Sequence, residues 1–253
     1  RYEYHVLDKS TISPEALDSL KKELVDLEEQ YPELVTPDSP TQRVAGAPLK
    51  QFKKIKHKVE QWSFNDAFDE EDIVKFDERV KKFLKPKFGD VSPLYTCELK
   101  IDGLKIILEY KNGYLVTAAT RGDGQVGEDV IMNVKTIESV PLKLLKDVDL
   151  IVEGEVYMPK TSFALLNKNQ QEKNEEVFAN PRNVAAGTIR QLDSKIVALR
   201  KLSTFIYDIA QIIPPTPLYF KGGTDPISTQ LLELQFLQSL GFKVNQNFAL
   251  CKN

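Results

Sequence analysis

The chain has 253 residues, of which 42% are hydrophobic and 28% are charged, and its net charge at neutral pH is -3. It is long enough to bury the core of one large domain plus a small one. No run approaches the about 20 apolar residues that span a bilayer, and the N-terminal residues lack the apolar core of a secretory signal. These features exclude a membrane-spanning protein and predict a cytoplasmic one.

The first predicted element is a helix within residues 12–34, where alanine and leucine repeat at three- and four-residue spacing. Ser13 is a suitable N-cap, and Pro14 suits the first helical position. Ile12 can pack on Leu17 as a hydrophobic staple. The proline-rich residues that follow have the turn chemistry of a linker. We therefore expect residues 1–48 to form a small helical unit with its linker, and residues 49–253 to form a larger domain.

Five lysines follow the linker: Lys50, Lys53, Lys54, Lys56 and Lys58. The net charge gives no global attraction to nucleic acid, so a local basic patch of this kind is where a phosphate backbone could bind. A charge run is more often a solvated face, and we favour that interpretation.

The next predicted elements are a second helix over residues 69–84, which Pro86 should end, and then several strands. KIILEY and YLVTAAT, residues 105–110 and 114–120, flank an Asn-Gly dipeptide, which is typical of a two-residue hairpin turn. The two strands should therefore be antiparallel. Two more strands are predicted at residues 149–158 and 202–212, and a closing helix at 228–242. The pattern predicts an α+β fold with helices around an antiparallel sheet.

GDGQVG, residues 122–127, matches the GxGxxG pattern of dinucleotide-binding domains. That pattern needs a parallel βαβ unit, whereas the strand before these glycines pairs backwards through the predicted hairpin. We therefore read the segment as a tight acidic loop and disfavour a dehydrogenase.

The two cysteines, Cys97 and Cys251, are far apart in sequence and belong to no CxxC pair. Neither a zinc site nor a disulfide framework is indicated. We expect two buried thiols.

The segment CELKIDG, residues 97–103, places an amine between two carboxylates if it is a strand. One face then carries Glu98, Lys100 and Asp102, and the other carries Cys97, Leu99 and Ile101. A half-buried strand with a charged outer face would show the same pattern. Gly103 adds information, because glycine lets a backbone approach a ligand closely or take a strained turn.

Lys100–Gly103 resembles the KxDG motif that carries the lysine nucleophile of DNA ligases, RNA ligases and capping enzymes. The strings TPDSPTQRV, CELKIDGL, ATRGDGQVGED, EGEVYMP and FANPRNVAAGTIRQLD are similar, in order and separation, to the NAD-dependent DNA ligases. This resemblance covers essentially the whole chain. It implies an ATP-grasp-like nucleotidyltransferase core, preceded by a helical subdomain that binds nicotinamide mononucleotide.

The resemblance also implies roles for individual residues. Lys100 would attack the α-phosphorus of NAD, release nicotinamide mononucleotide and retain AMP, with Asp102 at the reacting centre. Glu98 and Arg121 would contact the adenosine, and Glu155 its ribose. Asp102 and Glu155 would be the ligands of Mg²⁺. The other nucleotide-binding positions implied are Ser63, Phe64, Gly103 and Tyr207, with Tyr4, His5 and Asp18 for the nicotinamide half.

Arg182 and Arg190 fall in the string similar to the family segment that engages the 5′ phosphate of nicked double-stranded DNA. A guanidinium suits that role because it binds phosphate oxygens bidentately. Surface ion pairs are the alternative for both arginines. We expect a monomer that acts together with the remaining domains of a longer ligase.

The chain departs from the family pattern in the helical unit. Pro14 stands where an aspartate is usual, and Leu17 where a tyrosine stacks near the nicotinamide ring. Both replacements suit helix initiation but weaken the expected nicotinamide contacts. The chain also ends before the family's two later lysine motifs. A fragment of a longer ligase is expected, and the alternative is a reduced relative that binds nucleotide or DNA without turnover.

Overall fold

The computed structural model describes residues 3, 6–7, 11–43, 49–213 and 229–251. The chain divides into two compact units, one made of residues 1–60 with 101–244 and one of residues 61–100 with 245–253. Both units combine helices with antiparallel strands, which confirms the predicted α+β class. No helix among these described residues is long and apolar enough to cross a membrane.

The first unit begins with helix α2, Pro14–Gln30. Ser13 is its N-cap, as predicted, and the Ser13 side chain accepts a hydrogen bond from the backbone N–H of Ala16. Two short 3-10 helices follow, η1 at Pro32–Leu34 and η2 at Pro40–Arg43. The first part of the predicted linker therefore carries helical turns.

Arg43, at the end of η2, is tied to the turn after helix α4 (Ile131–Lys135). Its guanidinium donates hydrogen bonds of 3.0, 2.9 and 3.0 Å to the carbonyl oxygens of Lys135, Ile137 and Val140. Its Nε also lies 3.4 Å from a carboxylate oxygen of Glu138. One side chain thus binds three backbone acceptors of this turn.

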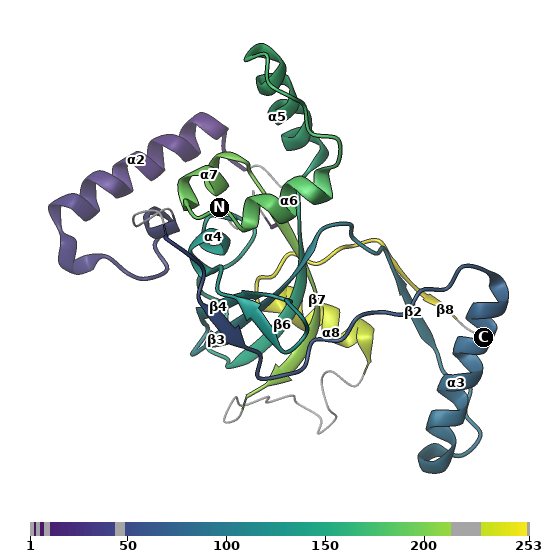
Figure 1. The fold of residues 1–253 in the computed structure, drawn as a ribbon. Helices are drawn as coiled ribbons and strands as arrows, with labels where there is room; N and C mark the ends of the chain where they lie inside the picture. The colour runs from purple at the N-terminus through teal and green to yellow at the C-terminus, as the bar shows by residue number, and fades with distance from the viewer. Residues whose placement is uncertain (1–2, 4–5, 8–10, 44–48, 214–228, 252–253) are drawn as a thin grey trace. The chain divides into compact units, whose positions relative to one another are not determined.

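A four-stranded antiparallel sheet in the order β4-β3-β6-β7 forms the core of the first unit (Figure 1). Its strands are β3 (Leu104–Lys111), β4 (Tyr114–Thr120), β6 (Leu150–Tyr157) and β7 (Ser203–Ile212). The predicted hairpin is confirmed, because β3 pairs antiparallel with β4 and both turn residues have positive φ, 49° at Asn112 and 75° at Gly113. A smaller ladder pairs β1 (Lys54–Lys56) with β5 (Val126–Glu128).

The two faces of the sheet differ in chemistry. Directly opposed residues of antiparallel strands share a face, and so do alternate residues along a strand. One face is apolar and fully or almost fully buried, and it includes Ile106, Leu108, Val152, Val156 and Ile206. The other face carries Lys105, Glu109, Glu153 and Glu155. The first face is the hydrophobic core, and the second presents charged groups.

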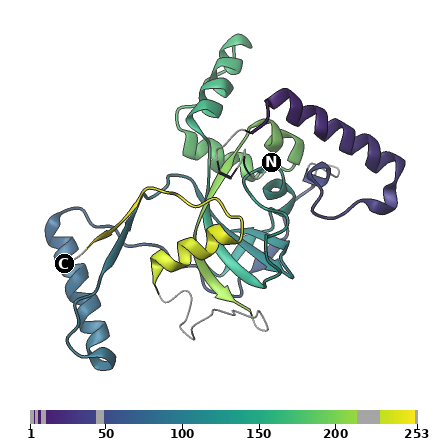
Figure 2. The same ribbon diagram turned by 180° about the vertical axis from the view of Figure 1, so that it is seen from behind.

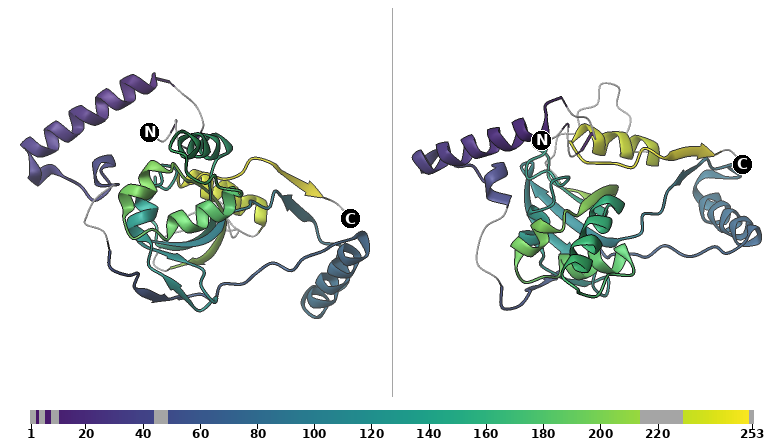
Figure 3. Two further views of the ribbon diagram at one scale, coloured as in Figure 1. Left: turned by 45° about the horizontal axis from the view of Figure 1, so that its top comes forward. Right: turned by 90° about the horizontal axis from the view of Figure 1, so that it is seen from above.

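Several helices belong to the same unit as this sheet. They are α4, α5 (Lys160–Glu172), α6 (Pro181–Ile189), α7 (Ser194–Leu199) and α8 (Gln230–Ser239). Of these, α4, α6 and α8 contact its strands. Helix α6 packs on β6 and β3, and it also contacts α7 (Figure 3). Helix α8, the predicted closing helix, packs against β7 (Figure 2). It begins at the N-cap Thr229 and stops before Gly241, whose φ is 98°.

The second unit contains helix α3 (Glu70–Phe88) and the antiparallel strands β2 (Tyr95–Glu98) and β8 (Phe248–Cys251). The prediction that Pro86 ends the helix was wrong. A proline in the last turn removes only one hydrogen bond, and the helix stops at Gly89, whose φ of 71° is incompatible with further helix.

Candidate functional site

The charged face of the sheet holds a buried amine beside two carboxylates. Lys105 of β3 lies directly opposite Glu155 of β6 in the strand register. Its Nζ is 2.5 Å from Oε2 of Glu153, the next residue of β6 on the same face. The side chains of Lys105 and Glu153 are only 15% and 8% exposed, and Glu155 is buried. Buried charges are stable only when they are paired, and here Lys105 and Glu153 form such a pair next to Glu155.

Tyr207 of β7 lies near the same carboxylates. The register between β6 and β7 shifts here, since Glu153 pairs with Asp208 and Gly154 with Ile206. Burial raises the pKa of the Tyr207 phenol, and the negative charges of Glu155 and Glu153 raise it further. The phenol therefore stays protonated at neutral pH and can donate a hydrogen bond.

Gly103 brings the predicted motif against this cluster. A Cβ on Gly103 would lie 2.1 Å from the carbonyl oxygen of Val156 and 3.0 Å from Cγ of Glu155, so only glycine fits. The close approach fixes the backbone next to Asp102 where β3 begins. The Asp102 side chain is exposed, and its Oδ1 pairs with Nη1 of Arg182 at 3.2 Å.

Lys100 and Glu98 belong to the second unit, which ends its first segment at Lys100. The predicted alternation along residues 97–103 was wrong beyond Glu98, because strand β2 ends there and residues 99–102 form no strand. A strand needs a partner, and β2 pairs with β8 only as far as Glu98. Lys100 is exposed. The nucleophile motif is thus an exposed connection that runs into β3.

Arg121 directly follows β4, and its carbonyl oxygen lies 3.0 Å from Nε2 of His57. The GDGQVG loop comes next. Gly122 has a φ of 59°, and the carboxylate of Asp123 accepts hydrogen bonds from the N–H groups of Gln125 and Val126, which lower the pKa of Asp123. The loop leads into the antiparallel strand β5, so it is the tight acidic loop predicted and not part of a βαβ unit.

Helix α6 carries the two predicted phosphate-binding arginines at its ends. Asn180 caps the helix by accepting from the N–H groups of Arg182 and Asn183, and Arg190 is the C-cap residue. Eight residues of helix separate the arginines by roughly 12 Å along the axis. Both side chains are 59% exposed. They are therefore presented to solvent at two fixed points.

Both arginines already hold a carboxylate. Arg182 pairs with Asp102, as described, and Arg190 makes a bidentate contact with Glu128, with Nε at 2.8 Å and Nη2 at 3.3 Å from its oxygens. Lys54 of β1 lies 3.4 Å from the same carboxylate. Hydrogen bonds from Arg190 are the main cause of the lowered pKa of Glu128. The ion-pair alternative is thus observed for both residues, and an anionic ligand would have to displace a carboxylate.

The remaining predicted site residues lie outside the cluster of Lys105, Glu153 and Glu155. Ser63 and Phe64 are exposed and belong to the second unit. Asp18 is exposed on α2, and Tyr4 and His5 lie outside the described residues. Of the five candidate lysines, Lys54 and Lys58 pair with carboxylates, Lys58 at 2.5 Å from Glu109.

Two acidic partners and one amine were missed from the sequence: Lys105, Glu128 and Glu153. The spacing of Glu153 and Glu155 in EGE places both on one strand face, and this signal could have identified Glu153. Lys105 could be identified only from the pairing of β3 with β6. The sequence around residues 105 and 155 contains no signal for that pairing.

The prediction of two buried thiols was also wrong. Cys97 is exposed and Cys251 is half-buried. Their sulfur atoms lie 3.4 Å apart, because β2 and β8 pair despite their distance in sequence. The hydrogen bond with Cys251 raises the pKa of the Cys97 thiol.

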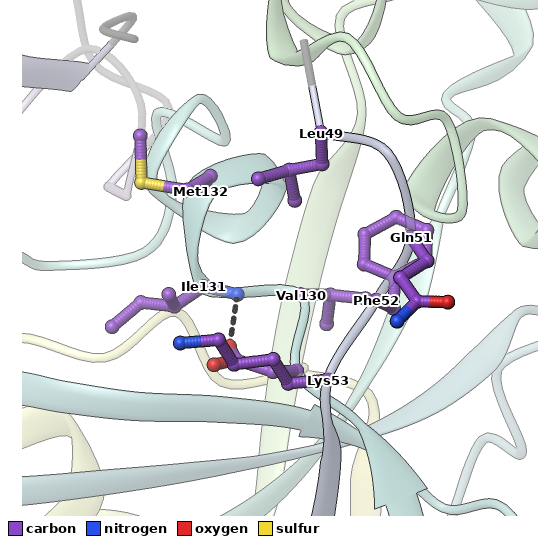
Figure 4. Close-up of a pocket in the computed structure, with 8 residues that line it drawn as sticks. Leu49, Gln51, Phe52, Lys53, Val130, Ile131 and Met132 are labelled. Atoms are coloured by element: carbon purple, nitrogen blue, oxygen red, sulfur yellow. Dashed lines mark hydrogen bonds between the residues drawn. The ribbon is translucent and has the colours of Figure 1, made fainter. Parts of the chain in front are cut away.

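A separate hollow of about 200 Å³ lies between the segment before β1 and the start of α4 (Figure 4). It is lined by Leu49, Gln51, Phe52, Lys53, Asp129, Val130, Ile131 and Met132. Of the candidate residues only Lys53 lines it, and it is smaller than the roughly 300 Å³ at which small-molecule pockets begin. We therefore assign it no part in the site.

The chemistry of the cluster suits a hard cation. Carboxylate oxygens are the ligands that Mg²⁺ takes, and it is usually held by one or two carboxylates plus substrate phosphates and water. In the part of the chain that the structure describes, no three or more His, Cys, Asp or Glu side chains are grouped to hold a metal ion. Asp102 and Glu155 fit the role of one or two carboxylate ligands, with the other ligands supplied by phosphates and water.

Comparison with known proteins agrees with the sequence motifs. The model of the family described as NAD-dependent DNA ligase adenylation domain matches residues 49–253, and that of DNA ligase-like, N-terminal NAD+-binding domain matches residues 1–45. The chain is 48% identical over 250 residues to the DNA ligase of Bacillus licheniformis, covering 99% of this chain and 35% of the relative. It is 49% identical over 252 residues to that of Thermotoga maritima and 45% identical over 252 residues to that of Caldicellulosiruptor bescii, again with 35% of each relative covered. The chain thus spans about a third of the length of these curated relatives.

Proposed function

Because the chain belongs to the NAD-dependent DNA ligase family, we propose that it transfers AMP from NAD to Lys100. The observation that carries this proposal is the close approach of Gly103 to strand β6. Because Gly103 has no Cβ, its backbone can lie against strand β6, which bears Glu155. The sheet therefore fixes the backbone at Gly103, three residues after the motif lysine.

In the proposed reaction, the neutral Nζ of Lys100 attacks the α-phosphorus of NAD. An N–P bond forms, the bond between the α-phosphorus and the bridging oxygen breaks, and nicotinamide mononucleotide leaves with the electron pair. Glu98 and Arg121 would hold the adenosine, and Glu155 the ribose hydroxyls. Ser63, Phe64 and Tyr207 would complete the nucleotide contacts.

Lysine is a poor nucleophile at neutral pH, because its ordinary pKa is about 10.4. Carboxylates near Lys100 would favour the protonated form unless another positive charge offsets them. Arg182 offers one such charge, since it pairs with the motif carboxylate Asp102. The positive nicotinamide of the substrate would supply another.

Mg²⁺ belongs to this proposal with Asp102 and Glu155 as its protein ligands. When bound, the ion would neutralise charge on the phosphates of the substrate. Asp102 has a second role in the structure, because it pairs with Arg182. Release of that ion pair would free a carboxylate oxygen for the cation.

We propose that residues 1–48 are a nicotinamide-mononucleotide-binding subdomain with its linker, and that residues 49–253 belong to an ATP-grasp-like nucleotidyltransferase domain. The family matches to residues 1–45 and 49–253 support this division. Asp18, with Tyr4 and His5, would bind the nicotinamide half. The two compact units of the structure divide the chain differently, since the first unit contains residues from both parts.

In the full-length protein, AMP would pass from Lys100 to the 5′ phosphate of a nick, and the 3′ hydroxyl would then displace AMP. Arg182 and Arg190 would bind the phosphates of nicked double-stranded DNA, with Lys54 close to Arg190. We propose that a monomer of the whole cytoplasmic ligase, including domains beyond this chain, carries out these steps.

The test is the intact mass of the chain after incubation with NAD and Mg²⁺. A mass increase equal to one AMP is expected for the chain and for Lys168→Arg, a change at an exposed lysine of α5, but not for Lys100→Ala or Lys100→Arg. An unmodified chain that still binds NAD would instead support a module that binds nucleotide without turnover. An adduct that persists at full yield in Lys100→Ala would contradict the assignment of the nucleophile.

A further inference from the structure

The second unit brings the chain's two cysteines together. Cys251 of β8 lies opposite Tyr95 of β2, and Cys97 lies opposite Ala249. Opposed residues share a face and so do alternate residues along a strand, so both thiols are on the same face of the ladder. Their Sγ atoms are 3.4 Å apart although 154 positions separate them in sequence.

Both thiols are within reach of a reagent in solution. Cys97 is exposed, Cys251 is half-buried, and neither is in a disulfide. Within the described parts of the chain, no third His, Cys, Asp or Glu joins them in a group that could hold a metal ion. A four-ligand structural zinc site, which needs two further ligands, is therefore not what the pair provides.

We propose that Cys97 and Cys251 form a reversible thiol–disulfide modification site that low-molecular-weight disulfides such as glutathione disulfide oxidise. One protein thiolate attacks glutathione disulfide, which forms a mixed disulfide and releases one glutathione thiolate. The second protein thiolate then attacks the protein sulfur of the mixed disulfide and releases a second glutathione. Two protein thiols and one glutathione disulfide thus become one protein disulfide and two glutathiones, with the protons of the two thiols carried by the glutathiones.

The position of the pair favours a disulfide that is easily reduced again. Diagonal neighbours across an antiparallel ladder typically have Cα atoms about 7–8 Å apart. Relaxed disulfides join Cα atoms about 4.4–6.8 Å apart, so the strands must draw together when the bond forms. Strained or exposed disulfides are the labile ones. The structure therefore points to a reversible modification on the strand that leads to Lys100, not to a permanent cross-link.

The experiment equilibrates the reduced chain in a series of glutathione redox buffers, followed by acid quenching and intact mass measurement. An intrachain disulfide appears as the loss of two hydrogen atoms, and a mixed disulfide as the gain of one glutathione. The same series is repeated in concentrated urea, where only chain connectivity brings the thiols together. We expect the effective concentration of one thiol for the other to be at least about tenfold higher in the folded chain than in urea.

Cys97→Ser and Cys251→Ser are the matched controls, because each can take up a single glutathione but cannot close. Mixed disulfides that accumulate on the folded chain with both cysteines present would overturn the proposal. An effective concentration no higher in native buffer than in urea would overturn it as well. No step of this experiment uses NAD, so its result stands apart from the outcome of the adenylation test.

Discussion

Nζ of Lys105 lies 2.5 Å from Oε2 of Glu153, and both side chains are largely buried, at 15% and 8% exposed. Removal of one partner of such a pair leaves an uncompensated charge in a poorly hydrated site, whereas removal of both does not. The effect of a substitution at Lys105 on stability therefore depends on which residue stands at position 153, and the reverse is also true.

We predict that Lys105→Met lowers the free energy of unfolding by about 3–5 kcal/mol, the usual cost of breaking a buried ion pair. The Lys105→Met, Glu153→Gln double variant should recover most of this loss. Urea denaturation measures both. Lys168→Met is the control, because Lys168 and Glu172 form an exposed pair at 3.8 Å, and its effect should stay within about 0.5 kcal/mol. Equal losses in the single and double Lys105 variants would argue against the pairing.

We predict that Gly103→Ala disrupts the start of β3, since the new Cβ would lie 2.1 Å from the carbonyl oxygen of Val156. The expected loss is at least about 1–3 kcal/mol, with reduced AMP transfer to Lys100. Gly187→Ala is the matched control in helix α6, where an added Cβ meets nothing within 4 Å. That variant should be more stable by about 0.5–1 kcal/mol. If both variants unfold alike, the close approach at Gly103 is not the cause.

We predict a pH-dependent contribution from the pair of Glu128 and Arg190. Arg190 lowers the pKa of Glu128 in the folded chain, so the folded carboxyl loses its proton at a lower pH than the unfolded one. The stabilisation is therefore present above the ordinary pKa of about 4.3 and is lost as the pH falls through the lowered value. Because Arg190 is 59% exposed, this stabilisation should not exceed about 1 kcal/mol. The difference in unfolding free energy between the chain and Glu128→Gln should thus shrink in acid, and a constant difference would contradict the role of the charge.

The same pair should control DNA binding in a full-length ligase that carries this chain. Glu128→Gln should tighten binding to nicked DNA, because Arg190 then has no carboxylate to give up. Arg190→Ala should weaken binding and reduce the salt slope by about 1, since each phosphate contact releases about one counterion. Lys168→Ala, on the exposed face of α5, should change neither quantity. Unchanged affinity in both Glu128→Gln and Arg190→Ala would favour a purely structural ion pair.

The helical unit offers a test of cofactor recognition. Helix α2 has the N-cap that the sequence predicted, and Leu17 is half-buried on it. We predict that the Pro14→Asp, Leu17→Tyr double variant reacts with NAD about tenfold faster or binds it about tenfold more tightly, which corresponds to about 1.4 kcal/mol of regained nicotinamide contact. The reverse reaction of pre-adenylated protein with nicotinamide mononucleotide should improve in parallel. Unchanged rates in both directions would mean that these two positions do not limit recognition.

Local signals predicted the local structure well. The Asn112–Gly113 turn fixed the hairpin because only a few residue types adopt positive φ at both positions, and the N-cap Ser13 marked the start of α2. Pro86 misled because the effect of a proline depends on where in the helix it stands, and near the last turn it is tolerated.

Long-range pairing is what the sequence left out. The sequence around Cys97 does not indicate that β8 pairs with β2. The sequence around Lys105 does not indicate that Glu153 lies beside it. These partners are decided by strand order and register across the fold. The roles that family resemblance implies for Lys100, Asp102 and Arg121 depend on bound ligands and remain predictions.

Arg43 has a consequence for how this protein can be divided. Its guanidinium donates hydrogen bonds to the carbonyl oxygens of Lys135, Ile137 and Val140, which lie within the residues that match the adenylation-domain family. The match to the adenylation domain begins only at residue 49. A truncation at that point, the natural choice for isolating the domain, would cut away the residue that closes one of its own turns. A fragment that begins at the boundary drawn from family similarity would lose these three hydrogen bonds, so we expect an adenylation fragment that begins upstream of Arg43 to be more stable.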